Sequence, residues 1–372
     1  MKILHLFNEI NFSGAEIMYA QAAPLLQGNG FELIAVSTGT NEGNYVKQYQ
    51  EANYKIYHKP LPAFSLLSLH KLLYYYKDFY FFLKQEKIDV LHIHRSNLIV
   101  SAFIAKFAKI KCIKTQHNNF RNNWYSLPYA IAWRFILRNL CQVTFQTIGE
   151  SVYDNELNYY RNPSVRVNNW FDEKKFYPAP NIDEKSNLRK QHSIPQDAFV
   201  IVSTGSCSHV KNHHDIIKAL ALVKDKINVL YLHLGQGKTG SEEKQLALDL
   251  GVSELTLFLG NKNNVRDYLV AADIFVMTSK FEGLSIAAIE AMACKLPCIL
   301  YNSPGLCDLI KNNDNGYLIK PDYHLLADTI INVRKYPDEV VKKTNHAYEY
   351  VKNEYSILNN VKKIIKLYKF IG

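Results

Sequence analysis

Short apolar runs alternate with amphipathic stretches along this chain of 372 residues. The opening reads as a strand at 2–7, a helix at 14–27 and a second strand at 31–37, with Gly14 at the start of the helix. A strand, a helix and another strand in this order are typical of doubly wound parallel sheets. Gly14 could let the backbone come close to a ligand phosphate, but a plain helix start explains it equally well.

The same alternation continues through the chain and predicts an α/β fold. Further strands are expected at 88–93, 111–115, 144–148, 165–167, 199–204, 228–234, 255–259, 273–278, 296–301 and 317–319. Prolines and charged residues in 171–197 indicate a linker. Residues 1–170 and 198–349 are therefore expected to form two domains, each large enough to bury a core of its own.

One strand, turn and helix in the second domain forms a candidate phosphate site. The apolar run 273–278 is followed by a turn at Gly283 and by the Ala-rich helix 286–294. Ser285 can cap this helix, and the N–H groups of Gly283, Leu284 and Ser285 are then expected to be free. Free N–H groups at a helix start attract phosphate.

Two glutamates bracket this helix start. Glu282 lies just before the first turn and Glu290 in the second, so they are separated along the axis by up to ~12 Å. A nucleotide sugar fits that spacing, because it has a diphosphate in its middle and hydroxyl-bearing rings at both ends. A glycosidase pair is disfavoured, because its two carboxylates must flank one bond.

A glycine loop at 235–240 follows the strand 228–234. Its G-x-G-x-x-G pattern is weak evidence for dinucleotide binding, because it falls in the middle of the second domain. It is not a Walker loop, because Leu232 stands where the first glycine is required. We interpret Gly235 and Gly237 as letting the backbone approach a base or ribose.

Histidines lie at the ends of two strands in the first domain. His92-Ile93-His94 has the spacing of a metal-binding pair, but with no third ligand nearby a structural role is favoured. His117 follows the strand 111–115, at the sheet edge where parallel sheets bind ligands. A structural role for His117 remains the alternative.

The run from Val90 to Gly149 contains no aspartate or glutamate. Its basic residues are Arg95, Lys106, Lys109, Lys111, Lys114, Arg121, Arg134 and Arg138, and its aromatic residues include Trp124, Tyr125, Tyr129, Trp133 and Phe135. This composition predicts a surface for an anionic membrane or a lipid-diphosphate acceptor. Nucleic acid is disfavoured because no nucleic-acid-binding module is recognisable. A solvated helix face above an aromatic core is the alternative. For the aromatic helix at 66–84 the alternatives are packing in the core and between domains, or a lipid-facing surface.

Composition narrows the class further. A net charge of +10 and a pI near 9.0 favour an anionic partner. The six cysteines show neither zinc-site nor disulfide spacing and are expected to be reduced thiols. No apolar run reaches the ~20 residues that span a bilayer, and the apolar start is too short for a signal peptide. We expect a cytoplasmic protein, with peripheral attachment to the inner membrane face as an option.

Several motifs occur in an order that matches one enzyme family. They are Ser13-Gly14-Ala15-Glu16, His92-Ile93-His94, Thr115-Gln116-His117-Asn118, Gly205 with Lys211-Asn212, Leu234-Gly235-Gln236-Gly237, Phe258-Leu259-Gly260, Ala271-Ala272-Asp273, Glu282 through Glu290, and Asn315-Gly316-Tyr317. In this order the chain resembles a GT-B glycosyltransferase, most closely the retaining family 4 type. The E-x7-E segment is the specific part of the likeness.

The resemblance implies two Rossmann-like domains facing across a cleft, with the acceptor on the first and a nucleotide sugar, UDP-linked, on the second. It implies that the last helix, about 350–372, packs back on the first domain. No cofactor or metal is expected. The site roles that it implies are Glu282 for the sugar hydroxyls, Glu290 for the ribose, Lys211 with the amides of Gly283, Leu284 and Ser285 for the diphosphate, His117 beside the reacting sugar, Gly14 near the phosphate, and Gly205, Gly235 and Gly237 around the donor.

One departure from the family stands beside Gly205. The family usually has an arginine there, but this chain has Ser206, which cannot clamp a phosphate with two hydrogen bonds. Either Lys211 and the helix amides suffice, or another basic residue such as Lys280 substitutes, or the donor binds weakly. The expected activity is retaining, metal-independent transfer to a glycan or lipid-linked oligosaccharide for a surface polysaccharide. The alternatives are a protein glycosyltransferase, a UDP-N-acetylglucosamine epimerase, and a non-catalytic nucleotide-sugar binder.

Overall fold

The computed structural model describes residues 1–62, 69–94 and 99–371. Arg95 and the first residues, 66–68, of the expected aromatic helix lie outside these ranges. The chain forms two compact units, one from Met1–Asn169 with Ile357–Gly372 and one from Trp170–Ser356. The segment 171–197, which was expected to be a linker, belongs to the second unit and contains a helix.

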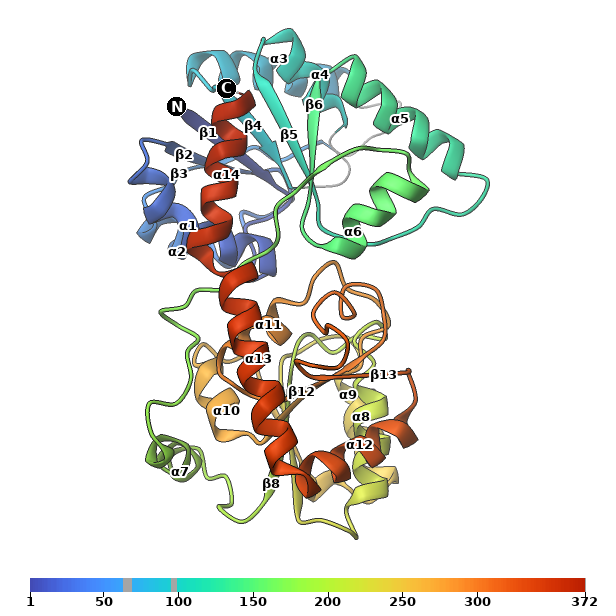
Figure 1. Cartoon of the computed structure of the whole chain (residues 1–372). Coiled ribbons are helices and arrows are strands. Elements are labelled where there is room, and N and C mark those ends of the chain that lie inside the picture. Colours follow the sequence, from blue (N-terminus) through green and yellow to red (C-terminus); the bar gives the residue numbers. More distant parts are fainter. Residues whose placement is uncertain (63–68, 95–98, 372) are drawn as a thin grey trace. The chain divides into compact units, whose positions relative to one another are not determined.

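The first unit is built on a parallel sheet with the strand order β3-β2-β1-β4-β5-β6-β7 among its described residues (Figure 1). The strands are β1 Lys2–Phe7, β2 Glu32–Ser37, β3 Lys55–His58, β4 Val90–Ile93, β5 Lys111–Gln116, β6 Val143–Thr147 and β7 Val165–Arg166. The helices are α1 Gly14–Gln27, α2 Val46–Glu51, α3 Leu69–Gln85, α4 Ile99–Phe107, α5 Leu127–Asn139, α6 Glu150–Asp154 and α14 Ile357–Ile371, with a π-helical turn at Asn155–Tyr159.

Alternate residues of the central strands face different helices. Leu4 and Leu91 pack in a core cluster with side chains of α3, α4 and α5. His5 and His92 are in register on neighbouring strands, and successive side chains of a strand point to opposite faces of the sheet. His92 Nδ1 lies 2.7 Å from the Tyr368 hydroxyl of α14. The second face of this sheet is therefore covered by α14, which lies beside α1.

The last helix is amphipathic. Val361, Ile364 and Tyr368 recur at helical spacing and are buried, whereas Lys362 and Lys366 are exposed. A stripe of this kind needs a partner surface, and α14 finds it in the first unit.

The second unit has a parallel sheet of its own, in the order β10-β9-β8-β11-β12-β13 among its described residues. The strands are β8 Phe199–Thr204, β9 Val229–Leu234, β10 Thr256–Gly260, β11 Ile274–Met277, β12 Cys298–Tyr301 and β13 Tyr317–Ile319. The helices are α7 Ile182–Gln191, α8 His213–Val223, α9 Gly240–Asp249, α10 Val265–Ala271, α11 Ile286–Ala293, α12 Tyr323–Lys335 and α13 Pro337–Tyr355, with a 3₁₀ turn at Ser253–Leu255.

Helix α7 is fastened to this sheet by charge. Arg189 is buried and its Nη2 lies 2.7 Å from Asp273 Oδ2, while Lys185 Nζ lies 2.7 Å from Asp273 Oδ1. The same carboxylate accepts a hydrogen bond from the N–H of Val200 at 2.7 Å. These contacts explain why a polar segment is ordered as part of the unit.

Both central sheets are buried on their two faces, as parallel sheets covered by helices require. All residues of β9 and β11 are buried. The predicted fold class, two Rossmann-like α/β domains, is confirmed. Among the described residues, no helix is both long enough and apolar enough to cross a bilayer.

Candidate functional site

Each sheet has a point where the chain reverses its direction of winding. In the second unit this point lies between β8 and β11, which are neighbours although their numbering is not consecutive. The loops that leave the carboxyl ends of such strands diverge and form a crevice for ligands. Residues 205–212 after β8 and 278–285 after β11 therefore define the candidate site.

A lysine and a glutamate meet in this site. Lys211 Nζ lies 2.6 Å from Glu282 Oε1, and the two side chains are only 21% and 15% exposed. The lysine stem passes over Gly205, since a Cβ added there would lie 3.5 Å from Lys211 Cε. The Thr278 hydroxyl lies 3.2 Å from the carbonyl oxygen of Lys211 and 2.8 Å from that of Asn212. The two loops are thus joined through backbone and side chains.

The start of α11 has the geometry expected from its sequence. Ser285 Oγ accepts a hydrogen bond from the Ala288 N–H at 3.2 Å. Within the described part of the chain, the N–H groups of Gly283, Leu284 and Ser285 have no hydrogen-bond acceptor. Glu282 is held by its own N–H, which donates to the Pro304 carbonyl at 2.8 Å. Free donors therefore stand directly after the Lys211–Glu282 pair.

The first two of the three glycines in the 235–240 loop, Gly235 and Gly237, pack against protein backbone. A Cβ on Gly235 would lie 1.9 Å from the carbonyl oxygen of Gly205, and one on Gly237 would lie 2.2 Å from that of Cys207. Gly235 also has a φ of +146°, which favours glycine. The need for glycine at these positions is thus explained by contact between the two loops. Their expected approach to a base or ribose remains a prediction.

Glu290 lies on α11 in surroundings that disfavour its charge. Burial raises the pKa of its carboxyl from 4.5 to about 8, although the charge of Lys175 acts in the opposite direction. At neutral pH the carboxyl is therefore largely protonated in this structure. A ribose diol, which can donate two hydrogen bonds, would favour the ionised form.

His117 and Gly14 belong to the first unit. Gly14 begins α1, where the preceding Ser13 hydroxyl contacts Glu16. His117 follows β5, and its Nε2 lies 3.2 Å from His94 Nδ1. Burial lowers the pKa of His117 to about 4, so its imidazole is neutral at physiological pH.

The His92-Ile93-His94 pair has a third histidine beside it, which the sequence pattern did not indicate. His5 Nδ1 lies 2.9 Å from His94 Nε2, and His5 is in register with His92. Both ring nitrogens of His92 are nevertheless used, by Tyr368 at 2.7 Å and by Thr115 at 2.6 Å. The hydrogen bonds therefore support a structural role for His92.

The basic surface expected from the acid-free run is smaller than its sequence indicates. Lys114 is buried, and burial lowers its pKa to about 8. Arg134 is 19% exposed and forms an ion pair with the buried Glu156. These two residues were wrongly counted as surface charge. Lys106, Lys109, Lys111 and Arg121 are exposed.

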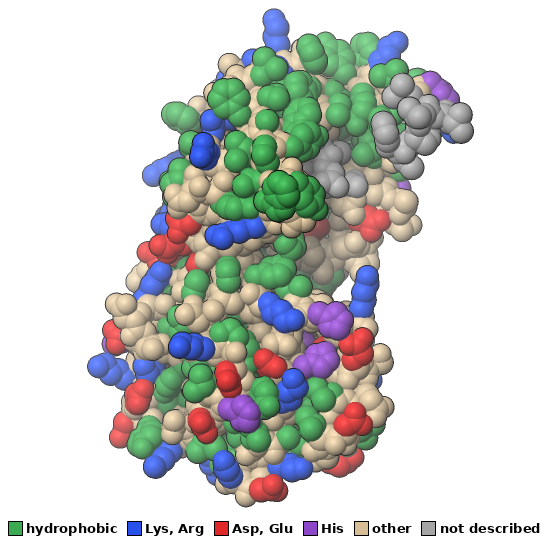
Figure 2. All heavy atoms as spheres, turned by 90° about the vertical axis from the view of Figure 1, so that its right-hand side faces the viewer, with side chains coloured by type: hydrophobic (Ala, Val, Ile, Leu, Met, Phe, Trp, Pro, Cys, Tyr) green, Lys and Arg blue, Asp and Glu red, His purple; other side chains and the backbone are tan. Residues whose placement is uncertain are grey.

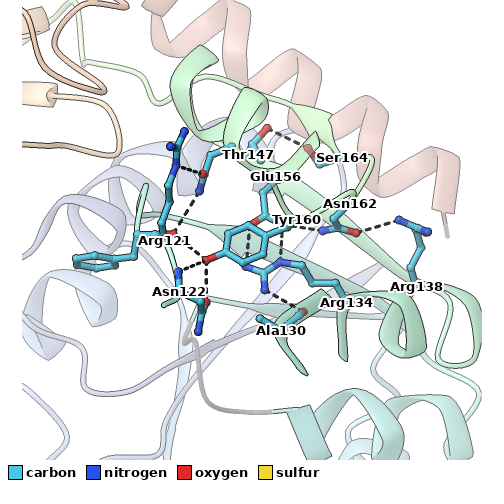
Figure 3. A network of polar contacts seen from close by, with 12 residues as sticks. Arg121, Asn122, Ala130, Arg134, Arg138, Thr147, Glu156, Tyr160, Asn162 and Ser164 are labelled. Carbon is cyan, nitrogen blue, oxygen red and sulfur yellow. Dashed lines mark hydrogen bonds and ion pairs between the residues drawn. The ribbon is translucent and has the colours of Figure 1, made fainter. Parts of the chain in front are cut away.

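Arg134 belongs to a network around Glu156 and Tyr160 (Figure 3). Its Nε and Nη2 donate to the two Glu156 oxygens at 2.9 and 2.8 Å, and its guanidinium carbon lies 3.6 Å from the Tyr160 ring centre. The Tyr160 hydroxyl lies 2.7 Å from Asn122 Oδ1 and accepts from the Asn122 N–H at 3.0 Å. The network ties α5, the loop after β5 and the π-helical turn together.

Aromatic side chains remain exposed on α4, on α5 and in the loop that precedes α5. They are Phe107 at the end of α4, Phe120, Trp124 and Tyr125 in the loop before α5, and Tyr129 and Phe135 on α5. Figure 2 shows hydrophobic side chains gathered on one face of the first unit. We call these six residues the aromatic surface.

The architecture and the loops after β8 and β11 together define the class of protein to which this chain belongs. Across 100% of this chain and 98% of the other, the fold matches that of a glycosyltransferase from Rickettsia africae, with a TM-score of 0.86 at 20% identity. Anabaena HepE, solved in complex with UDP and glucose, matches over 99% of both chains with a TM-score of 0.84 at 18% identity. The protein therefore has the GT-B fold of glycosyltransferases.

The family follows from the sequence matches. Residues 184–354 match the family Glycosyl transferases group 1, and residues 12–150 match Glycosyltransferase Family 4. The chain belongs to this group 1 and family 4 type of glycosyltransferase, and the expected family is confirmed.

Curated relatives have similar sequences. The UDP-Gal:alpha-D-GlcNAc-diphosphoundecaprenol alpha-1,3-galactosyltransferase of Escherichia coli is 29% identical over 82% of this chain and 78% of its own length. The N-acetyl-alpha-D-glucosaminyl L-malate synthase of Bacillus anthracis is 26% identical over 68% of this chain and 67% of its own length.

Proposed function

We propose that this glycosyltransferase moves a sugar from a nucleotide diphosphate sugar, UDP-linked, to a lipid-linked oligosaccharide with retention of the anomeric configuration. The observation that carries the proposal is the Lys211–Glu282 pair, at 2.6 Å, directly before three free backbone N–H groups. A cation, hydrogen-bond donors and an acceptor for sugar hydroxyls then lie in one crevice.

Donor binding exchanges the partners of this pair. The diphosphate takes Lys211 and the N–H groups of Gly283, Leu284 and Ser285, while Glu282 accepts hydrogen bonds from the sugar hydroxyls. This exchange would explain how the diphosphate is bound although Ser206 replaces the family's arginine, because Lys211 is already held at the site by Glu282. Glu290 binds the ribose at the other end.

The chemical step follows from these positions. The bond from the anomeric carbon to the β-phosphate oxygen breaks, and the nucleoside diphosphate leaves with the electron pair. The acceptor oxygen bonds to the anomeric carbon from the same face and gives its proton to the departing diphosphate. Lys211 and the N–H groups stabilise the growing negative charge without a divalent metal. His117, being neutral, orients a sugar hydroxyl.

The acceptor side is assigned to the first unit. The aromatic surface, together with Lys106, Lys109 and Lys111, suits the interface of an anionic membrane. Relatives include the undecaprenol-linked galactosyltransferase of Escherichia coli and the capsular polysaccharide glycosyltransferase CapH of Staphylococcus aureus, which is 23% identical over 78% of each chain. We assign the protein to surface polysaccharide synthesis at the cytoplasmic face of the membrane.

A donor screen tests the reaction. Nucleotide sugars are incubated with and without undecaprenyl-diphosphate-linked acceptors, in buffer without divalent metal, and nucleoside diphosphate release is measured. Release that depends on acceptor supports transfer, and the anomeric proton coupling of the product reports retention or inversion. No release with any donor, but binding of UDP, would instead favour the non-catalytic binder.

Vesicle sedimentation tests the membrane contact. The protein is spun with anionic and neutral vesicles over a salt series. We expect binding to anionic vesicles that weakens with salt, and weaker binding for Trp124→Ser. Equal recovery in the supernatant under all conditions would contradict a membrane surface.

A further inference from the structure

Four metal-ligating side chains meet inside the second unit, away from any role assigned above. They come from four places in the chain: Cys207 follows β8, His213 opens α8, His233 lies on β9 and Glu243 on α9. All four are buried, between 0% and 3% exposed. One ligand atom from each lies within 4.8 Å of all the others.

The distances between two pairs of ligand atoms in the cluster suit tetrahedral coordination of an ion. Cys207 Sγ lies 3.2 Å from His233 Nε2, and His213 Nδ1 lies 3.3 Å from Glu243 Oε1. Ligand atoms around tetrahedral zinc, at bond lengths of about 2.0–2.3 Å, are themselves about 3.3–3.8 Å apart. Only small side-chain movements would be needed to surround an ion.

Outer groups hold these ligands in place. His233 Nδ1 lies 3.2 Å from the hydroxyl of Ser203, its neighbour in register on β8, so Nε2 is directed at the cluster. The Thr239 hydroxyl donates to Glu243 Oε1 at 2.8 Å. Metal-binding histidines and carboxylates usually have such outer hydrogen bonds.

One atom is not explained by hydrogen bonding within the protein. Glu243 is 0% exposed, and in the described structure its Oε2 has no hydrogen-bond partner. A buried carboxylate oxygen without a hydrogen-bond donor is costly, and a bound cation would remove that cost.

We propose that Cys207, His213, His233 and Glu243 bind a zinc ion. One sulfur, two nitrogens and one oxygen suit zinc better than the oxygen-preferring Mg²⁺ or Ca²⁺. Because the protein supplies all four ligands, the site is structural and takes no part in sugar transfer. Binding releases the thiol proton of Cys207, since the thiolate is the ligand. The cysteine spacings alone indicated no zinc site, because the other three ligands are not cysteines.

The ion would also support the candidate donor site. Lys211 lies between Cys207 and His213 in the chain, and the N–H of Cys207 donates to the Gln236 carbonyl at 3.3 Å. Zinc would thus hold together the two loops whose backbones meet at Gly205 and Gly235. This is a stabilising role for loops that carry the proposed donor contacts, and it does not depend on that function being correct.

Metal analysis of the full chain tests the proposal. The protein is purified under reducing, metal-defined conditions, its zinc content is measured by mass spectrometry, and Zn²⁺ or Co²⁺ alone is added to the metal-free form. We expect about one ion per chain, a higher melting temperature with Zn²⁺, and Co²⁺ spectra with visible bands of a tetrahedral site and a thiolate-to-cobalt charge-transfer band.

Matched cysteine variants locate the ligand. Cys207→Ser should abolish the charge-transfer band, whereas Cys307→Ser, at a cysteine outside the cluster, should keep it. If Cys207→Ser does not fold, the wild-type Co²⁺ spectrum decides. Zinc far below one ion per chain, together with no tetrahedral cobalt spectrum from the folded metal-free protein, would overturn the proposal. A cobalt spectrum without the charge-transfer band would also overturn it.

Discussion

Lys211 Nζ lies 2.6 Å from Glu282 Oε1, although 71 residues separate the two in the chain. Family resemblance assigns them to different parts of a donor, one to the diphosphate and one to the sugar. In this structure they are each other's partner. Each side chain is therefore held at the site by the other, and a ligand must compete with this contact.

Substituting Lys211 and Glu282 one at a time should distinguish UDP binding from sugar transfer. We expect Lys211→Ala to weaken UDP binding about 10- to 100-fold, because it removes a charge-assisted hydrogen bond to phosphate. Glu282→Gln should leave UDP binding unchanged or tighter, because Lys211 loses its competitor, and should lower kcat/KM for the nucleotide sugar about 10²–10³-fold. Calorimetry with UDP and initial rates measure the two effects.

The control for this pair is Lys280→Ala. Lys280 is exposed and close in the chain to Glu282, and it is the other lysine that was expected to compensate for Ser206. We expect it to change UDP binding by less than about threefold. A larger loss with Lys280→Ala than with Lys211→Ala would move the phosphate contact to Lys280.

Glu290→Gln should change how stability depends on pH. Burial raises the pKa of Glu290 from 4.5 to about 8 in the fold, so the folded chain keeps a proton that the unfolded chain loses above about pH 4.5. The contribution of Glu290 to the free energy of unfolding is full below pH 4.5. It falls by up to about 1.4 kcal/mol per pH unit as the pH rises, and it levels off above about pH 8. The melting temperature of Glu290→Gln should therefore rise relative to that of the wild type as the pH increases from 5 to 8.

Glu254→Gln serves as the reference for that experiment, because Glu254 is exposed. Its melting curve should run parallel to that of the wild type across the same pH range. Parallel curves for Glu290→Gln as well would show that Glu290 ionises normally in the fold.

Gly235→Ala should destabilise the second unit. The new Cβ would lie 1.9 Å from the Gly205 carbonyl oxygen, and the backbone is held on the other side by a hydrogen bond from the Gly235 N–H to Gly260 at 2.9 Å. Steric overlap and the positive φ together should cost about 1–3 kcal/mol or more. Gly240→Ala, where the nearest atom is 3.6 Å away, should melt like the wild type, and equal losses at both positions would refute the account.

Glu156→Gln should destabilise the first unit by about 3–5 kcal/mol, because it leaves Arg134 beside a neutral amide in a mostly buried place. The exposed pair Lys47–Glu51, with side chains 80% and 64% exposed, provides the comparison. Glu51→Gln should change the urea midpoint little, since surface ion pairs contribute about 0–1 kcal/mol. Similar midpoints for both variants would mean that the Arg134–Glu156 pair does not support the fold.

Local patterns predicted the elements well and the contacts between distant residues poorly. The apolar runs predicted the parallel strands except β3 at Lys55–His58, and Ser285 was recognised as the cap of α11 because a cap depends on its immediate neighbours. The acid-free run overstated the surface charge because Glu156, which pairs with Arg134, lies just beyond its end. His5 joins His92 and His94 through the strand register, and nothing in the residues around His5 indicates that register.

The helix α14 completes the first unit from the far end of the chain, after the whole of the second unit. During synthesis residues 1–169 of the first unit emerge before the second unit. His92 can form its contact with Tyr368 only after α14 has been made, and until then the apolar side chains that α14 covers stay exposed. The second unit, being continuous, can fold in that interval. The first unit is therefore expected to complete its fold after the second, because a helix that is synthesised after the whole second unit stabilises the domain that precedes it in the chain.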